Sequence, residues 1–272
     1  MNTIAFIGGG NMARALIGGL LNSGVSADQI AVAEPVAAAA RALADDFGVR
    51  VSGDNNEVAE LADCLLLAVK PQVLKGVVTD LVDTVATRKP VVVSIVAGIP
   101  LASLTGWLAG PTALVRTMPN TPALVGRGIT ALFANDQVSP AQRQLAEQVM
   151  RAAGSTLWVD DESLLDAVTA VSGSGPAYFF RVMEAMIDTG QSLGLSAEQA
   201  TRLTLATAAG AAELAIQSNT GVAQLREQVT SPGGTTAAAL AVMEQMALGS
   251  VFDKALRAAS QRAAELALEA GG

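Results

Sequence analysis

The chain has 272 residues, with 17 lysines and arginines against 25 aspartates and glutamates, one cysteine and no histidine. The missing histidine excludes Ser-His-Asp triads, Cys-His dyads and histidine-containing zinc sites, and the single cysteine excludes disulfides and thiolate metal clusters. A net charge of -8 and an aromatic content of 3% argue against a nucleic-acid partner, which needs clustered lysine and arginine.

Hydrophobic residues make up 51% of the chain, so a membrane protein has to be considered. The longest stretch without a charged residue, 90–115, exceeds the ~20 residues that span a bilayer. Glycines and prolines interrupt it, however, and its part 91–96 is typical of a buried parallel strand. The first residues run directly into a predicted strand without a secretory signal. We therefore expect a soluble, cytoplasmic protein with no membrane partner.

The first half of the sequence alternates short β-branched runs with amphipathic stretches. This alternation predicts an α/β fold with a doubly wound parallel sheet of the Rossmann type over residues 1–160. Helices are expected at 12–22, 36–47 and 140–153, the last with Ser139 as its N-cap. The expected strands are 4–7, 30–33, 49–51, 64–69, 91–96, 114–116, 129–134 and 156–159.

The strand signal ends near residue 160, and the rest of the chain is rich in alanine and leucine. We expect an all-α domain over 161–272, with helices starting near Pro176, at a capping box that begins with Ser196, and after Gly234. The stretches 203–212 and 235–243 are very apolar for a bundle that stands alone in water. They are either buried in a subunit interface or form the ordinary core of a larger bundle.

A glycine-rich motif ends the first predicted strand and opens the first predicted helix. Gly8 permits the tight turn, Gly10 lets a pyrophosphate approach the backbone, and Ala13 allows close packing of helix and strand. The helix N-terminus adds N–H groups for the phosphates. A purely structural glycine turn is the alternative, but the strand-to-helix context favours dinucleotide binding.

An acidic residue, Glu34, ends the second predicted strand, 21 positions after Ala13. A carboxylate there can accept hydrogen bonds from the adenosine ribose and repels a 2′-phosphate, which favours NADH over NADPH. A solvent-exposed glutamate before Pro35 is the alternative.

Further segments end at the carboxyl edge of the predicted sheet, where open α/β sheets bind ligands. Lys70 either approaches the coenzyme phosphate or ribose, or is a solvated strand-end lysine. Small residues around Ala97 would let a nicotinamide ring approach the backbone. The prolines within 116–122 fix an extended polar loop over the same edge.

Two glycine-rich segments lie in the helical half. Residues 172–176 are typical of a tight interhelical connection. They either serve packing and turning only or have a functional role as well. Residues 230–236 place hydroxyl groups and free backbone N–H groups at the start of a helix expected over 236–246. Such an N-terminus suits a small anion such as a substrate carboxylate, with a plain helix cap as the alternative.

In this order, the motifs resemble those of the pyrroline-5-carboxylate reductases over essentially the whole chain. The resemblance implies reduction of 1-pyrroline-5-carboxylate to L-proline with NADPH or NADH, the last step of proline biosynthesis, in the cytoplasm. It also implies a Rossmann domain followed by an α-helical dimerisation domain, with homodimers that assemble further, often to decamers. The motifs that carry it are the N-terminal fingerprint, Ala68-Val69-Lys70-Pro71, Met118-Pro119-Asn120-Thr121-Pro122, Ser172-Gly173-Ser174-Gly175-Pro176-Ala177-Tyr178 and Thr230-Ser231-Pro232-Gly233-Gly234-Thr235-Thr236.

The resemblance also implies roles for single residues. Thr236 looks like the hydroxyl that hydrogen-bonds the pyrroline nitrogen, and Glu162 matches an acidic position near the substrate. The position of Glu34 varies in the family, so the resemblance leaves the coenzyme preference open. The carboxylate cradle of the family is matched by Ser231, Gly233, Gly234 and Thr235. Coenzyme contacts are matched by Gly8, Gly10, Asn11, Met12, Asn56, Ala68, Val69, Lys70, Pro71, Ala97 and Asn120.

The implied chemistry suits a chain without histidine. A cyclic imine is basic enough to be protonated near neutral pH, and its iminium carbon accepts a hydride directly. A β-hydroxyacid dehydrogenase, the enzymatic rival, needs a base, and the only lysine after residue 89 is Lys254, far in sequence from every glycine motif. A dinucleotide-sensing regulatory protein is the non-catalytic alternative, against which the hydroxyl cluster at 231–236 argues.

Overall fold

The computed structural model describes residues 2–271, which form two compact units. The first unit comprises residues 2–174 together with 259–271, and the second comprises 175–258. The chain therefore returns to the first unit along its last helix, α13 (Leu248–Gly271). The division falls after Ser174, whereas the sequence placed the change near residue 160. The difference arises because α8 (Leu164–Val168) packs on strands β6 and β7 of the first unit.

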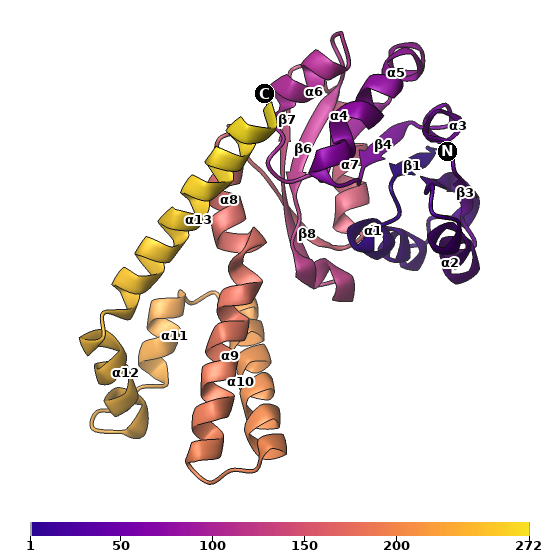
Figure 1. Ribbon diagram of the computed structural model, residues 1–272. Coiled ribbons are helices and arrows are strands. Elements are labelled where there is room, and N and C mark those ends of the chain that lie inside the picture. Colours follow the sequence, from indigo (N-terminus) through magenta and orange to yellow (C-terminus); the bar gives the residue numbers. More distant parts are fainter. Residues whose placement is uncertain (1, 272) are drawn as a thin grey trace. The chain divides into compact units, whose positions relative to one another are not determined.

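An eight-stranded sheet with the order β3-β2-β1-β4-β5-β6-β7-β8 forms the centre of the first unit (Figure 1). Strand β1 pairs with both β2 and β4, so the strand order reverses beside β1 and creates a topological switch point. The strands are β1 Ile4–Ile7, β2 Ile30–Ala33, β3 Arg50–Ser52, β4 Cys64–Leu67, β5 Val91–Ser94, β6 Leu114–Met118, β7 Gly128–Ala134 and β8 Gly154–Trp158.

One strand departs from the predicted parallel sheet. Strand β7 runs antiparallel to β6, while the other neighbouring strands are parallel. The connection between them, residues 119–127, holds only the short 3-10 helix η2 (Thr121–Val125). A parallel crossover needs a dozen or more residues, so this connection is too short to return the chain to the other end of the sheet.

Helices cover both faces of the sheet, which is why the central strands are buried along their whole length. Phe6 and Val32 face one core, and Ala5 and Leu65 face the other. The first core is closed by α1 (Asn11–Asn22), α2 (Ala37–Phe47) and α7 (Pro140–Arg151), and the second by α3 (Asn55–Ala59), α4 (Pro71–Asp80), α5 (Val82–Arg88) and α6 (Leu101–Trp107).

The second unit is entirely helical over residues 175–258. Helices α9 (Gly175–Ser192) and α10 (Ala197–Gln217) pack along each other, and α11 (Val222–Gln228), α12 (Thr235–Gln245) and the first part of α13 complete it (Figure 1). The predicted capping box at the start of α10 is confirmed, since Ser196 Oγ accepts a hydrogen bond from the Gln199 N–H over 3.2 Å.

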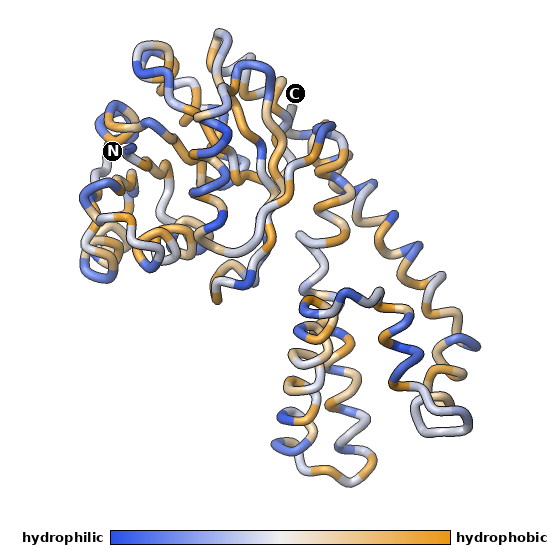
Figure 2. Tube along the Cα trace, turned by 180° about the vertical axis from the view of Figure 1, so that it is seen from behind, coloured by the Kyte–Doolittle hydropathy of each residue, from blue (hydrophilic) through white to orange (hydrophobic). Residues whose placement is uncertain are grey.

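Many apolar side chains of the second unit are exposed in the single chain, and Figure 2 shows hydrophobic residues along its helices. No residue of α12 is buried. The apolar stretches predicted at 203–212 and 235–243 therefore do not form an ordinary core within one chain. The exposed apolar side chains include Phe179, Phe180, Leu203, Leu205, Ile216, Val242, Met243, Met246 and Phe252.

The stretch 90–115 folds into β5, α6 and β6 instead of one long helix. Within residues 2–271, none of the helices is by itself both long and apolar enough to cross a membrane. Helices α12 and α13 pass that test only as a pair over 235–269, with a bend of 53° between them.

Candidate active site

The glycine-rich turn after β1 brings three strand ends together. Gly8 has a φ of +101°, and a Cβ at this position would lie 2.6 Å from the Ala68 carbonyl oxygen. The Gly8 N–H donates a hydrogen bond to the Ala33 carbonyl over 2.9 Å. Only glycine fits this conformation and this close approach. The turn is thereby fixed between the ends of β2 and β4, at the switch point of the sheet.

The N-terminus of α1 is open to a ligand. Gly10 is its N-cap residue, and a Cβ there would meet no atom within 4 Å. No side chain caps this end of the helix, and Asn11 is exposed. The first-turn N–H groups, which include those of Asn11 and Met12, therefore present a partial positive charge suited to a pyrophosphate.

Glu34 is fixed beside this turn. Its Oε2 accepts a hydrogen bond from the Gly9 N–H over 3.1 Å, and its Oε1 accepts one from the Val36 N–H over 3.0 Å. The side chain is half-buried, so it is not the freely solvated glutamate of the alternative interpretation. The structure thus holds a carboxylate at the end of β2, next to the phosphate turn.

The next loops lie at the same edge of the sheet. Val69 and Ala68 adjoin Gly8, and Lys70 is exposed directly before Pro71, the first residue of α4. Ala97 is exposed in the loop that links β5 to α6. Residue 98 of that loop has a φ of +76°, and a Cβ there would lie 3.6 Å from the Leu266 Cβ. The C-terminal part of α13 therefore covers the loop that follows β5.

Two asparagines of the expected coenzyme set are engaged within the protein. Asn120 donates from Nδ2 to the Ser172 carbonyl over 3.1 Å and accepts at Oδ1 from the Ile129 N–H over 3.0 Å. Asn56 donates from Nδ2 to the Asp80 carbonyl over 3.2 Å and accepts at Oδ1 from the Thr84 hydroxyl. Both side chains thus hold neighbouring segments together.

Asn55, which was not among the predicted site residues, is the first residue of α3. Its side chain forms no hydrogen bond with the part of the chain that the structure describes, in contrast to that of Asn56. The only sequence signal for it is the asparagine pair after Asp54, which is the N-cap of α3.

Residues 172–176 run from the end of a π-helix through a bend at Ser174 into α9. The Ser174 N–H donates to the Thr169 carbonyl over 2.8 Å, which is the spacing of the π-helix η3 (Thr169–Gly173). A Cβ on Gly173 would lie 2.5 Å from the Met118 Cε, so the glycine permits close contact with the end of β6. Such π-helical turns are frequent at functional sites.

Glu162 lies in the first unit, shortly before α8, and is engaged with two other segments. Its Oε1 accepts hydrogen bonds from Arg116 Nη1 and from the Leu101 N–H, each over 2.8 Å. Arg116 is only 7% exposed. No role was predicted for this arginine from the sequence, although a charged residue in a buried strand run is a signal that it has a partner.

The expected carboxylate cradle belongs to the second unit. Gly233 has a φ of +71°, and the Gly234 N–H donates to the Ser231 carbonyl over 3.0 Å, which forms a tight turn before α12. Gly234 is the N-cap of α12, and no side chain caps that helix. The first-turn N–H groups are therefore free, unlike in a plain hydroxyl cap. Thr235 is exposed and Thr236 is half-buried at this helix start.

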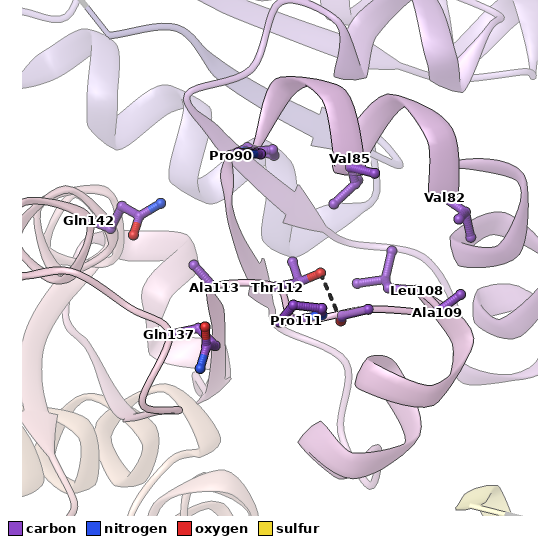
Figure 3. A pocket seen from close by; sticks show the side chains of 13 residues that line it. Val82, Val85, Pro90, Leu108, Ala109, Pro111, Thr112, Ala113, Gln137 and Gln142 are labelled. Carbon is purple, nitrogen blue, oxygen red and sulfur yellow. Dashed lines mark hydrogen bonds between the residues drawn. The ribbon is translucent and has the colours of Figure 1, made fainter.

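A cavity of about 500 Å³ lies at the opposite edge of the sheet, before β5 and β6 (Figure 3). Val82 and Val85 of α5 and Leu108, which follows α6, form one wall, and Gln137 and Gln142 lie across from it. None of the expected coenzyme residues lines it, so it is separate from the candidate site.

The described residues, 2–271, contain no group of three histidine, cysteine, aspartate or glutamate side chains that could hold a metal ion. The one cysteine, Cys64, is fully buried in β4, and burial raises the pKa of its thiol. A thiolate therefore takes no part in the candidate site.

Two family models match the sequence. The model described as pyrroline-5-carboxylate reductase dimerisation matches residues 162–266, and the model described as coenzyme F420-dependent NADP oxidoreductase matches residues 3–98.

Individual proteins match nearly the whole chain. The pyrroline-5-carboxylate reductase of Pseudomonas aeruginosa is 51% identical over 98% of this chain and 98% of its own. A solved pyrroline-5-carboxylate reductase from Coxiella burnetii has a TM-score of 0.94 at 43% identity, over 97% of this chain and 98% of that chain. The Plasmodium falciparum pyrroline carboxylate reductase, solved with NADP bound, has a TM-score of 0.86 at 27% identity, over 98% of each chain. The predicted fold class, a Rossmann-type domain followed by an α-helical dimerisation domain, is confirmed.

Proposed function

The chain belongs to the pyrroline-5-carboxylate reductase family, and on that premise we propose that it reduces 1-pyrroline-5-carboxylate to L-proline with NADPH or NADH. The observation that carries the proposal is the open N-terminus of α1 beside the carboxylate of Glu34. It gives a dinucleotide a place for its pyrophosphate and a partner for its ribose, at the switch point of a Rossmann-type sheet.

The coenzyme fits the residues present. Gly8 permits the tight turn, Gly10 leaves open space for a pyrophosphate, and the first-turn N–H groups of Asn11 and Met12 would bind it. Ala68 and Val69 border the same turn and Lys70 and Pro71 follow them in the chain, while Ala97 would contact the nicotinamide. Because the side chain of Asn56 is engaged with Asp80 and Thr84, we propose that Asn55 supplies the coenzyme contact from α3. The side chain of Asn120 is engaged as well, so Asn120 contributes to coenzyme binding through its backbone or through the segments that it holds together.

We assign the substrate to the start of α12. The free N–H groups after Gly234, with the hydroxyls of Ser231 and Thr235, bind the carboxylate, because a helix N-terminus favours an anion. The Thr236 hydroxyl hydrogen-bonds the ring nitrogen.

The reaction needs little proton transfer by the enzyme. The substrate nitrogen arrives protonated, and NADPH or NADH, when bound, supplies the hydride to the imine carbon. The contribution of the chain is to orient the carboxylate and the nitrogen, and orientation of this kind lowers a barrier by up to ~7–11 kcal/mol. This is consistent with a sequence that has no histidine to act as a base.

For assembly, we propose a homodimer formed through the second unit, and a decamer built from such dimers in the cytoplasm. Exposed apolar side chains on α9, α10 and α12 support the dimer, since isolated monomers rarely expose so many. The acidic chain has no need of a nucleic-acid or membrane partner for this reaction.

One assay separates the proposal from its rivals. Purified protein is mixed with 1-pyrroline-5-carboxylate and NADH or NADPH, coenzyme oxidation is followed by absorbance, and proline is measured as product. A parallel panel contains 3-hydroxy acids with NAD. We expect oxidation and stoichiometric proline in the first arm alone. Turnover of a hydroxy acid would instead identify a dehydrogenase, and coenzyme binding without turnover in either arm would identify a sensor.

A further inference from the structure

An ion pair between a buried arginine and a partly exposed glutamate connects three segments at the carboxyl edge of the sheet. Arg116, near the end of β6, is 7% exposed, and its Nη1 lies 2.8 Å from Glu162 Oε1. The same oxygen accepts the Leu101 N–H over 2.8 Å. One carboxylate atom thus joins β6, the start of α6 and the segment before α8. These partners are 46 and 61 positions from Glu162 in sequence.

The segment that Glu162 holds is the loop where the nicotinamide is expected. Leu101 is the first residue of α6, and the loop before it contains Ala97. The N-cap of α6 is Pro100, which offers no side-chain acceptor, so Glu162 satisfies a helix-end N–H from elsewhere in the fold. Arg116 pairs in register with Ser94, the last residue of β5, directly before this loop.

The loop has a second constraint on its other side. Gly98 has a φ of +76°, and a Cβ there would lie 3.6 Å from the Leu266 Cβ on α13. A shift of the loop in that direction would meet α13. The position of the loop at the sheet edge is therefore set by the Glu162 contact and by α13 together.

We infer that Glu162, held by Arg116, is a positioning residue for the coenzyme: it fixes the 95–100 loop against which the nicotinamide binds. The inference rests on the proposed function, and it differs from the role near the substrate that the resemblance suggests for Glu162. Truncation of Glu162 to alanine leaves the α6 N–H without an acceptor and the Arg116 cation buried without a hydrogen-bond partner, so the loop moves.

The test uses three variants of the full-length protein. Glu162→Ala removes both contacts, Glu162→Asp keeps the charge but withdraws the oxygen by one methylene, and Glu162→Gln keeps an oxygen acceptor at full length. NADH affinity is measured by calorimetry without substrate, and kcat and the two KM values are measured separately. The control is Glu147→Ala, because Glu147 Oε1 likewise accepts from an arginine and a second donor, and its side chain is also 25% exposed.

We expect Glu162→Ala to weaken NADH binding about tenfold and Glu162→Asp about fivefold, in line with the loss of a hydrogen bond to a charged group, with KM for the imine within twofold of the wild type. Glu162→Gln should lose less NADH affinity than Glu162→Asp, and Glu147→Ala should leave NADH affinity unchanged. If Glu162→Ala does not fold, the NADH affinities of Glu162→Asp and Glu162→Gln test the inference.

Two results would overturn the inference. A rise in KM for the imine with NADH affinity unchanged would make Glu162 a substrate contact. A fall in thermal stability with both affinities unchanged would make it a structural residue only. Since NADH binding is measured without turnover, a wild-type protein that binds NADH but does not reduce the imine would refute the proposed function and leave the positioning comparison intact.

Discussion

The carboxylate of Glu34 accepts a hydrogen bond from the Gly9 N–H over 3.1 Å, and so the acid that ends β2 is tied to the phosphate turn that ends β1. A second bond from the Val36 N–H, over 3.0 Å, holds the other oxygen. The negative charge is therefore fixed where an adenosine ribose binds in folds of this type.

This relationship predicts the coenzyme preference. A 2′-phosphate would lie against a fixed carboxylate, and such like-charge contacts are strongly unfavourable, so we expect NADH to have a kcat/KM at least about tenfold above that of NADPH. Glu34→Ser should reverse or abolish that ratio. Glu57→Ser, which removes another acid near the end of β3, should leave it unchanged. Steady-state kinetics with both coenzymes checks this, and a wild-type preference for NADPH would contradict it.

The two glycines of the phosphate turn should respond differently to alanine. Gly10 has a φ of −69° and open space at its Cβ position, so Gly10→Ala should fold with an unchanged Tm. Its methyl group would occupy the space of the pyrophosphate, and we expect KM for the coenzyme to rise about tenfold or more. Gly8→Ala should instead lower Tm, because φ is +101° and the Cβ would meet the Ala68 carbonyl. Thermal melts and coenzyme titrations separate the two effects, and a loss of Tm in Gly10→Ala would be inconsistent with this explanation.

The glycine-rich turn after β1 and the acidic residue after β2 were predictable from sequence, and so were the central strands. The runs 4–7 and 30–33 are β1 and β2 as predicted, because a strand buried on both faces must be apolar throughout. The predicted strands 64–69 and 91–96 were two residues too long, since β4 and β5 leave the sheet at Leu67 and Ser94 to enter the ligand-binding loops.

Contacts between distant segments were not predictable in the same way. Asn120 bonds to Ser172, 52 positions away, and Arg116 to Glu162, 46 positions away. Hydrophobic periodicity reports which face of an element is buried, but it carries no information about which polar groups meet across the fold. The roles of Asn120 and Glu162 could therefore be suggested only by resemblance, and their actual hydrogen-bond partners required the structure.

The substrate end of the site predicts a specific effect at Thr236. Its hydroxyl lies in the first turn of α12, so Thr236→Ala removes one positioned hydrogen bond without altering the helix start. We expect kcat to fall roughly ten- to a hundredfold while NADH affinity is unchanged. Thr236→Ser should keep most of the activity. The control is Thr201→Ala on α10, where the hydroxyl bonds only to the Ala197 carbonyl. An unchanged kcat in purified Thr236→Ala would count against the assignment.

The exposed apolar surface of the second unit predicts that the chain is not a monomer. Phe180 on α9 is 62% exposed and Val242 on α12 is 59% exposed, and their burial against a second copy would remove apolar area from water. Light scattering should therefore return at least twice the chain mass of 27.5 kDa. Phe180→Glu or Val242→Glu should shift the protein toward monomers and lower its Tm, because each places a charge in the interface. Gln191→Glu, at an exposed polar position near the end of α9, adds the same charge and should change neither the mass nor the Tm. A stable wild-type species with the mass of one chain would refute this prediction.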